Sequence, residues 1–224
     1  MELEYREWEM DRLEIRGEGD GQKVRGQGVP FDRMSEDMGG WQEVIRQGAA
    51  TQSLKEENIV MLWAHDSAQP ISRVGATRHA LELEERSSGV WFEQAAAAFT
   101  DFQLQKIDDG VVEKMSFGFF IEDFEKDQLW TEGGGKKKAL REILKMNLRE
   151  ISPVVFPAYP STNVALRSAI ACGVTIQGDA YDEMRQHLLA VDERLAEADG
   201  ALAEFERDHD RLRLAALAHM AQPQ

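Results

Sequence analysis

The stretch from Val111 to Phe120, which reads Val-Val-Glu-Lys-Met-Ser-Phe-Gly-Phe-Phe, constrains the fold more than any other part of the chain. β-Branched and aromatic residues dominate it, and such residues favour an extended strand over a helix. On a strand, Phe117 and Phe119 would point to one face. Ser116 and Gly118 would point to the other face, so the sequence predicts a single hydroxyl in an apolar setting.

Two interpretations of Ser116 are open from this stretch alone. A serine on a strand is most often a core residue whose hydroxyl bonds a neighbouring carbonyl group. No Gly-x-Ser-x-Gly motif surrounds Ser116, so the common hydrolase signature is absent. A catalytic role for Ser116 therefore depends on the polar side chains that the rest of the chain can bring to it.

The overall charge limits the partners that a chain of this kind can have. The 224 residues carry a formal charge of −15, from 41 acidic and 26 basic side chains. Such a surface disfavours nucleic acid or an anionic membrane as the main partner. The single cysteine, Cys172, excludes an internal disulfide and a cysteine-based zinc site. No apolar stretch is long enough to span a membrane and the N-terminus is acidic, so we expect an intracellular protein.

A histidine follows the most apolar run of the first half of the chain. Residues 59–63, Ile-Val-Met-Leu-Trp, predict a buried strand, and His65 and Asp66 come directly after it. A rigid element can position reactive side chains at its end. A solvated strand end that carries these two residues by chance is the alternative, and the sequence leaves it open.

A carboxylate lies within another predicted strand, from Leu148 to Phe156. Period two places Glu150 on the same face as Leu148 and Ser152, and a carboxylate on an apolar face is costly unless it is paired. Ser116, His65 and Glu150 would together supply a nucleophile, a general base and a carboxylate that orients the imidazole. Catalytic triads occur in any chain order, so the order of these residues neither supports nor excludes one.

The remaining elements follow from local patterns. Residues 23–31 predict a strand that ends at a proline, and residues 41–48 suit a strand or a short helical turn. Residues 73–92 predict a hairpin, residues 93–104 an amphipathic helix, and residues 127–138 a flexible loop. Loose alternation near the N-terminus predicts four buried side chains, at Leu3, Tyr5, Leu13 and Ile15.

The chain changes character from Tyr181 onward. Apolar residues recur there at heptad spacing, and they are Leu188, Val191, Leu195, Ala198, Leu202, Phe205 and Leu212. Gly200 and His209 weaken this short coiled-coil pattern. The sequence thus predicts a first domain over residues 1–170 and a linker with a helical tail over residues 171–224. The tail suits either packing on that domain or pairing with a partner helix.

Four blocks of sequence also carry a resemblance to a known family. They run from Gly26 to Gly48, from Met61 to Asp66 (Met-Leu-Trp-Ala-His-Asp), from Met115 to Phe119 (Met-Ser-Phe-Gly-Phe) and from Leu148 to Tyr159. In this order they resemble the prohead (capsid maturation) protease family of tailed bacteriophages, relatives of the herpesvirus assemblin. The resemblance covers roughly residues 20–167.

The resemblance implies roles for particular residues and a fold. It implies Ser116 as the nucleophile and His65 as the base. Assemblin relatives use a second histidine as the third member, whereas the corresponding strand here offers Glu150. The chain departs from the family pattern at Pro153, where an aliphatic residue is usual, which puts the geometry of that strand in question. The implied fold is α+β, dominated by an antiparallel, barrel-like sheet flanked by helices, with the helical tail added.

We therefore expect a serine endopeptidase that cleaves scaffold and capsid-protein extensions, and also itself, inside the procapsid in the host cytoplasm. Its partners would be the phage major capsid protein and the scaffold, with contact through the tail helix and a homo-oligomeric state. No cofactor, metal, nucleic acid or membrane is expected. One alternative is a non-catalytic scaffold or assembly factor that acts through the tail. A metal hydrolase using His65, Asp66 and His79 is another, although the His-Glu-x-x-His spacing is missing.

Overall fold

The computed structural model describes residues 3–7, 13–56, 58–134, 137–155, 162–176, 181–183 and 185–186. The chain divides into two units, Met1–Gly178 and Asp179–Gln224. Every element below belongs to the first unit. The heptad positions from Leu188 onward lie outside the described residues, so the coiled-coil tail and the boundary at residue 170 stay predictions.

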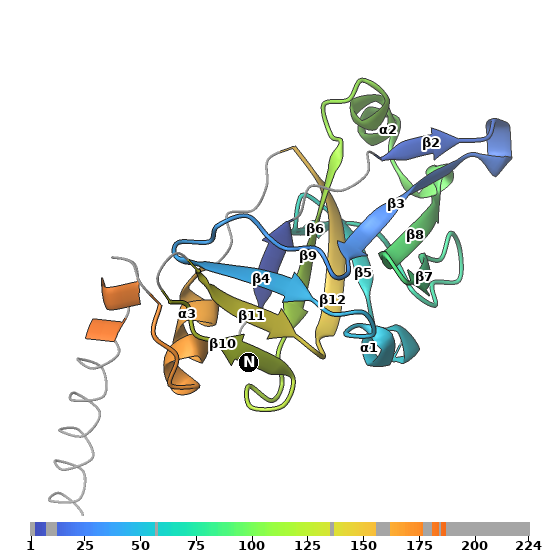
Figure 1. Ribbon diagram of the computed structural model, residues 1–224. Helices are drawn as coiled ribbons and strands as arrows, with labels where there is room; N and C mark the ends of the chain where they lie inside the picture. The colour runs from blue at the N-terminus through green and yellow to red at the C-terminus, as the bar shows by residue number, and fades with distance from the viewer. Residues whose placement is uncertain are drawn as a thin grey trace, which may run out of the picture. The chain divides into compact units, whose positions relative to one another are not determined.

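A five-stranded sheet runs through the middle of the first unit (Figure 1). Its strands, in spatial order, are β1 (Glu4–Glu7), β9 (Lys114–Phe120), β12 (Asn147–Val154), β5 (Val60–Trp63) and β6 (Asp66–Arg73). β12 and β5 pair in parallel, and the other neighbours pair antiparallel. The three predicted strands that carry Ser116, the run before His65, and Glu150 are therefore all in one sheet.

Two smaller sheets complete the strand content of the described residues. The first holds β10 (Gln128–Thr131), β11 (Ala139–Ile143) and β4 (Trp41–Ile45), with β11 and β4 parallel. The second is wholly antiparallel and holds β2 (Glu14–Arg16), β3 (Lys23–Pro30), β8 (Gly89–Ala95) and β7 (Glu82–Arg86).

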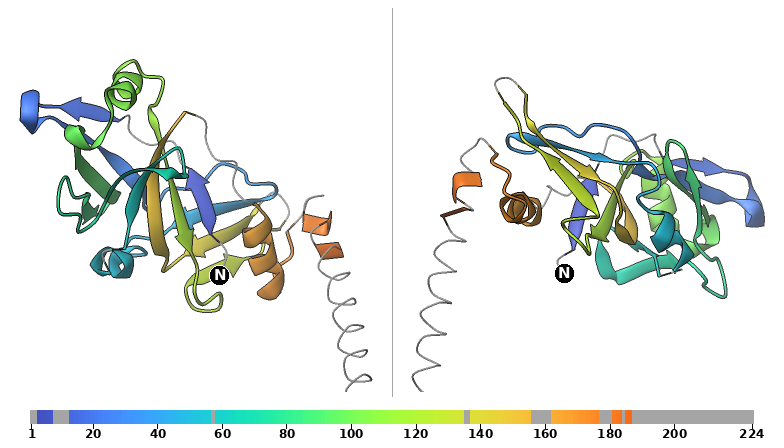
Figure 2. Two further views of the ribbon diagram at one scale, coloured as in Figure 1. Left: turned by 180° about the vertical axis from the view of Figure 1, so that it is seen from behind. Right: turned by 60° about the horizontal axis from the view of Figure 1, so that its bottom comes forward.

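Helices are few and short (Figure 2). They are α1 (Thr51–Lys55), α2 (Asp101–Asp108) and α3 (Thr162–Ala171), with 3₁₀ turns at Gly19–Gly21 and Ala96–Ala98. α3 packs on β10, where Trp130 Nε1 donates a hydrogen bond of 3.3 Å to Ser168 Oγ. No helix in the described part of the chain is long and apolar enough to cross a membrane.

The α+β class is confirmed, but none of the described sheets closes into a barrel. A barrel needs its first and last strands to pair, whereas β1 and β6 are the two edges of the five-stranded sheet. Two of the described sheets are also mixed, because β12 pairs with β5 and β11 with β4 in parallel. The prediction of an antiparallel, barrel-like sheet is therefore right only for part of the strand pairs.

The faces of β9 follow the predicted alternation. Phe117 and Phe119 are buried in the hydrophobic core with Met61 and Ile151. Their rings stack with centroids 5.8 Å apart. Burial of several aromatic and aliphatic side chains on this face fixes the register of β9, since a slip of one residue would expose them all.

Some local predictions were confirmed and others were wrong. The strand over residues 23–31 and the hairpin within residues 73–92 are present as β3 and as β7 with β8, and residues 41–45 form a strand. The helix predicted over residues 93–104 is wrong, because Glu93–Ala95 extend β8 along β3. The helix begins instead after Thr100, whose side chain and that of Gln103 form a capping box. The loop predicted over residues 127–138 begins with β10, which pairs with β11.

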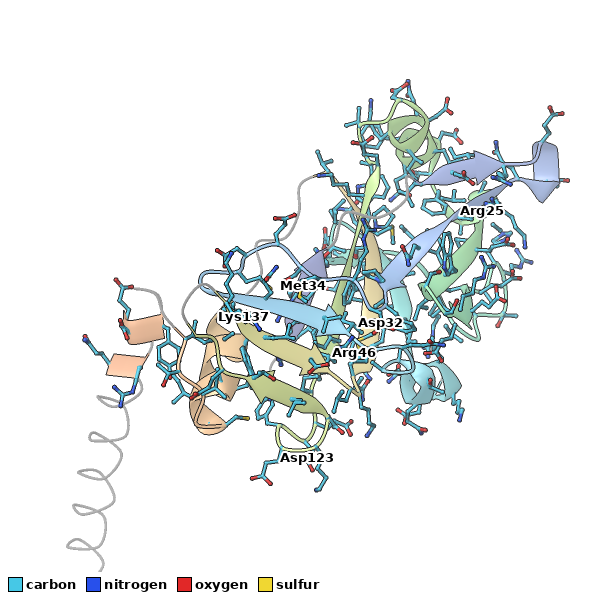
Figure 3. The ribbon with its side chains drawn as sticks, viewed as in Figure 1. Arg25, Asp32, Met34, Arg46, Asp123 and Lys137 are labelled. Carbon is cyan, nitrogen blue, oxygen red and sulfur yellow. The ribbon has the colours of Figure 1, made fainter. Side chains whose placement is uncertain are left out.

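Arg46 connects the end of β4 to two other segments. It pairs with Glu142 of β11, and its guanidinium lies 3.0 Å from Asp32 Oδ1 in the loop after β3. Figure 3 shows Arg46 and Asp32 together at this corner of the first unit. The pair with Asp32 is exposed and contributes little to stability.

Candidate active site

Two neighbouring strands present a polar face. In the antiparallel pair of β9 and β12, Ser152 lies opposite Ser116, and Glu150 lies opposite Gly118. Directly opposed residues project from the same side of a sheet. Ser116, Ser152 and Glu150 are all buried, so this face carries two hydroxyls and one carboxylate away from solvent.

A β-bulge turns Glu150 toward this face. The register of β12 against β9 shifts between Leu148, which opposes Phe119, and Glu150, which opposes Gly118. Arg149 is the additional residue. The bulge places Leu148 on the core face and Glu150 on the polar face, so the prediction that they share a face is wrong. The prediction that Glu150 and Ser152 share a face is confirmed.

His65 stands in a tight turn between β5 and β6. Ala64 and His65 both have positive φ, of 52° and 63°. Two-residue hairpin turns with this geometry favour Asn-Gly, because positive φ strains residues that carry a Cβ. The strain persists because β12 holds the turn. Ala64 N donates to Pro153 O at 3.1 Å, and His65 N donates to Ser152 Oγ at 3.3 Å.

Pro153 does not interrupt its strand. It keeps its place in the register opposite Met115, and β12 continues to Val154. Its carbonyl is the group that accepts the Ala64 hydrogen bond. The departure from the family pattern at this position thus leaves the strand intact.

Glu150 binds the imidazole ring of His65 directly. His65 Nδ1 lies 2.8 Å from Glu150 Oε1, and Glu150 Oε2 accepts a hydrogen bond from Ser152 Oγ. A carboxylate oxygen accepts hydrogen bonds, so Nδ1 is the donor in this pair and Nε2 is the ring nitrogen left to exchange a proton. Nε2 is buried and has no hydrogen-bond partner among the described residues. The ring is therefore oriented as a general base requires.

Gly118 makes room for this carboxylate. A Cβ atom at Gly118 would lie 2.8 Å from Glu150 Oε1 and 3.1 Å from a ring carbon of Tyr5, both too close. The Tyr5 ring in turn packs edge-on against His65, with centroids 4.6 Å apart. Burial, and then the charge of Glu150, raise the pKa of Tyr5. Tyr5 therefore stays neutral and closes the polar face as an uncharged group.

Ser116 has another partner in this structure. Its Oγ donates a hydrogen bond of 3.1 Å to the carbonyl oxygen of Arg6 in β1, where Glu7 opposes Ser116 in the register. No hydrogen bond joins Ser116 to His65 among the described residues. The sheet thus brings all three predicted site residues to one face, links His65 with Glu150, and leaves Ser116 bonded to a backbone carbonyl.

Four buried charged side chains meet on the face of β1 that points away from His65, and we call them the ion cluster. They are Glu4 and Arg6 of β1, Glu43 of β4 and Arg141 of β11. Arg6 Nε lies 2.7 Å from Glu43 Oε1, and Arg141 contacts both Glu4 oxygens, at 2.6 and 2.9 Å. Arg141 also lies 2.9 Å from Glu43 Oε2. Each charge therefore has partners of opposite sign.

The ion cluster corrects the N-terminal prediction. We expected Leu3 and Tyr5 to be buried, but the structure buries Glu4 and Arg6 and leaves Leu3 and Tyr5 at intermediate exposure. Burial alone would raise the pKa of Glu4. The charges of Arg141 and Arg6, with their hydrogen bonds, outweigh that effect and lower the pKa of Glu4 to about 2. Burial opposes the charged form of Arg141, but the two carboxylates raise its pKa.

The residues of the metal-hydrolase alternative do not meet. Asp66 accepts hydrogen bonds of 2.8 Å from Ala68 N and from Gln69 Nε2, and its side chain is exposed. The carbonyl of His79 accepts from Ser72 and Gln94. Within the described ranges, no three His, Cys, Asp or Glu side chains gather as metal ligands.

One protein family matches most of the chain. The model of the caudovirus prohead serine protease family matches residues 9–172. The chain belongs to this family. Membership identifies it as a serine protease of phage prohead maturation. Searches of curated proteins and of solved structures found no match. Ser116, His65 and Glu150 of this prohead protease lie within the matched residues, and β1 precedes them.

Sequence reasoning did not recognise two features of the prohead protease. Ser152 was expected on the face of Glu150, and that placement is the signal that could have marked it as a partner of the carboxylate. The ion cluster had a weaker signal. Glu4 and Arg6 alternate with Leu3 and Tyr5, and the pattern of apolar residues favoured the wrong face.

Proposed function

We propose that this prohead protease is an endopeptidase in which Ser116 is the nucleophile, His65 the general base and Glu150 the carboxylate that orients His65. One observation carries the proposal. His65 Nδ1 is hydrogen-bonded to Glu150 Oε1 at 2.8 Å, on the face of the sheet that Ser116 shares with Glu150. A serine, an imidazole and a buried carboxylate are the parts that acyl transfer needs.

The mechanism follows from the atoms available on that face. Ser116 Oγ forms a bond to the carbonyl carbon of the scissile peptide, and His65 Nε2 takes the hydroxyl proton. The charged imidazole is stabilised by Glu150, and it returns the proton to the leaving amine as the peptide C–N bond breaks. Water then attacks the acyl enzyme by the same route, releasing the acid and restoring Ser116.

Ser152 would act as a positioning residue in this mechanism. Its hydroxyl donates to Glu150 Oε2, and it accepts from the backbone of His65. It therefore holds the carboxylate and the turn that carries the base in one arrangement. A serine beside the nucleophile also has to be distinguished from it experimentally, because Ser152 is equally buried.

The substrates belong to the same proposal. We propose that the protease cleaves scaffold and capsid-protein extensions inside the procapsid, in the host cytoplasm. It would also cleave itself, and it would act as a homo-oligomer. The tail from Tyr181 onward would bring it to the scaffold through a helix pair. Loss of incorporation, with peptide cleavage retained after removal of the tail, would support that part.

The test is a pair of serine variants of the full chain, assayed for cleavage of capsid protein. Ser116→Ala removes one oxygen and leaves almost no cavity, so we expect no cleavage and unchanged thermal unfolding. Ser168→Ala is the matched control, because Ser168 is also buried but lies on α3. Cleavage by a folded Ser116→Ala protein would reject the mechanism.

A further inference from the structure

The hydroxyl of Ser116 is hydrogen-bonded to the backbone of the protein's own β1. Ser116 is fully buried, and its hydrogen bond goes to the carbonyl of Arg6 at 3.1 Å while His65 Nε2 has no partner among the described residues. A nucleophilic serine must face the carbonyl of the residue it cleaves after. In this structure the peptide carbonyl in front of Ser116 is that of Arg6.

The element that supplies this carbonyl is an edge strand. β1 has four residues, runs antiparallel to β9, and pairs with no strand on its other side among the residues that the structure describes. Addition of an extended peptide to a sheet edge is a common mode of peptide recognition, in which the backbone supplies affinity and alternate side chains supply specificity. β1 has the geometry of such a peptide.

Glu4 and Arg6, the alternate side chains of β1, contact charged residues of β4 and β11. We call Glu43 and Arg141 the charged site, and we call the first unit without β1 the body. Arg6 lies against Glu43, with Nε 2.7 Å from Oε1 and Nη2 3.1 Å from Oε2. Its guanidinium also lies 5.5 Å from the ring centroid of Phe119 and 6.0 Å from that of Trp41. A buried carboxylate between aromatic rings selects a cationic side chain.

A second subsite lies two residues earlier along β1. Both oxygens of Glu4 are held by Arg141, whose Nε is fixed by Gln128 Oε1 at 2.6 Å. Without β1, the body would keep Glu43 and Arg141 paired at 2.9 Å, with unused hydrogen-bonding capacity on both. The body thus carries one acceptor and one donor at the spacing of alternate residues on a strand.

Tyr5 lies between Glu4 and Arg6 on β1, and its side chain is on the side of the proposed catalytic groups. Tyr5 opposes Gly118 in the register and packs against His65. β1 therefore contacts the nucleophile through its backbone, the base through Tyr5, and the charged site through Glu4 and Arg6.

We propose that β1 occupies the substrate position of this protease, and that the site takes an extended peptide with an acidic residue two positions before a basic residue. The carbonyl of the basic residue is the one that Ser116 attacks. This inference rests on the proposed role of Ser116. In the occupied form, the Ser116 hydroxyl donates to the Arg6 oxygen rather than to His65, so β1 is held as an inhibitor and must leave before a substrate binds.

The experiment uses the unmodified full chain and two peptide phosphonate diphenyl esters that modify serine nucleophiles. One has the sequence acetyl-Glu-Tyr-Arg with the phosphonate in place of the arginine carboxyl group. The matched control is acetyl-Arg-Tyr-Glu, which has the same composition with the charges exchanged. The rate of modification, the modified residue from peptide mapping, and hydrogen exchange of residues 3–7 are measured together.

We expect the Glu-Tyr-Arg reagent to modify Ser116 at least about tenfold faster than the Arg-Tyr-Glu reagent, because the wrong charge would face an unpaired buried partner. We also expect residues 3–7 to lose their protection from exchange in the modified protein. Equal rates for the two reagents, or a β1 that stays protected after modification of Ser116, would overturn the inference while leaving Ser116 as the nucleophile.

A small fluorophosphonate distinguishes a failure of the inference about β1 from a failure of the proposed role of Ser116. If neither the peptides nor the fluorophosphonate modifies Ser116, the proposed mechanism fails, and the inference fails with it.

The charged site is tested by Glu43→Gln, which should reduce the preference between the two peptides to less than about threefold. Glu93→Gln is the control, because Glu93 pairs with Lys23 on the four-stranded sheet. An unchanged preference in a folded Glu43→Gln protein would exclude Glu43 as the selecting group.

Discussion

The two faces of β1 and β9 each hold buried polar groups, but they treat them differently. On one face, the ion cluster pairs two carboxylates with two guanidinium groups, and Arg141 alone contacts Glu4, Glu43 and Gln128. On the other face, His65 and Glu150 are paired, but His65 Nε2 is buried without a partner among the described residues. Every charge of the ion cluster has a partner of opposite sign, whereas the imidazole on the other face has one nitrogen without a partner among the described residues.

The difference between the two faces suggests that one serves mainly stability and the other mainly catalysis. A buried charge that loses its partner is costly, so the ion cluster holds β1 and the smaller sheet in one arrangement. A base with an open position can accept a proton, but it leaves a buried polar atom unsatisfied. The positive φ of Ala64 and His65 adds strain to the same face. We therefore expect substitutions on the His65 face to affect catalysis, and substitutions in the ion cluster to affect stability.

The largest expected effect is on catalysis. His65→Ala should lower kcat by about 10⁶-fold, and Glu150→Gln by about 10⁴-fold, since the carboxylate acts only through the base. Neither variant should change the thermal midpoint by more than a few degrees. The measurement is single-turnover cleavage of capsid protein. A Glu150→Gln protein with full activity would show that another group orients His65.

The next effect is on stability. Arg141→Met removes the guanidinium that both carboxylates share and should lower the free energy of unfolding by about 3–5 kcal/mol. Lys23→Met, which breaks an exposed pair with Glu82 and Glu93, should cost less than about 1 kcal/mol. Chemical denaturation measures both. Equal costs in the two variants would mean that the ion cluster adds no more than a surface pair.

Acid should weaken the ion cluster through Glu4. The pKa of Glu4 falls from 4.5 to about 2 on folding. A lowered pKa stabilises the folded state above pH 4.5, and the contribution is lost as the pH falls toward 2, in total up to about 3 kcal/mol. The stability difference between the natural chain and Glu4→Gln should therefore shrink over this window. A difference that does not change with pH would contradict a charged Glu4.

The smallest expected effect tests Ser152, which binds Glu150 within β12 and the backbone of His65 in the turn after β5. Ser152→Ala removes one of the hydrogen bonds to Glu150 and should lower kcat about tenfold, with KM nearly unchanged. A role in folding alone would lower stability without changing the kcat of the folded protein. Ser152→Thr keeps the hydroxyl and should restore part of the loss. Complete inactivity of folded Ser152→Ala would instead make Ser152 a candidate nucleophile.

The sequence predicted the strands that carry the candidate site better than it predicted how the sheets are assembled. Apolar runs and β-branched residues predict strands directly, so Ser116, His65 and Glu150 were each placed correctly on a strand or at its end. Their position in one sheet could not be derived, because strand order depends on long-range packing. The bulge at Arg149 was equally hidden, since simple alternation assigns Glu150 to the face of Leu148.

The errors share a physical cause. Ala95 to Ala98 suit a helix by propensity, but pairing of β8 with β3 extends the strand through Ala95. Glu4 and Arg6 were expected outside because charges are costly to bury. They are buried because Glu43 and Arg141, far away in sequence, supply the opposite charges. Tertiary partners outweigh local preference in both cases.

The most direct test of the proposed mechanism is fluorophosphonate modification of the full chain, followed by peptide mapping. The reagent forms a stable bond only with an activated serine, and noncovalent occupation by β1 slows that reaction without preventing it. We predict modification of Ser116 in the natural chain and none in His65→Ala. Modification of Ser152 or another serine, or equal modification of Ser116 without His65, would contradict the mechanism.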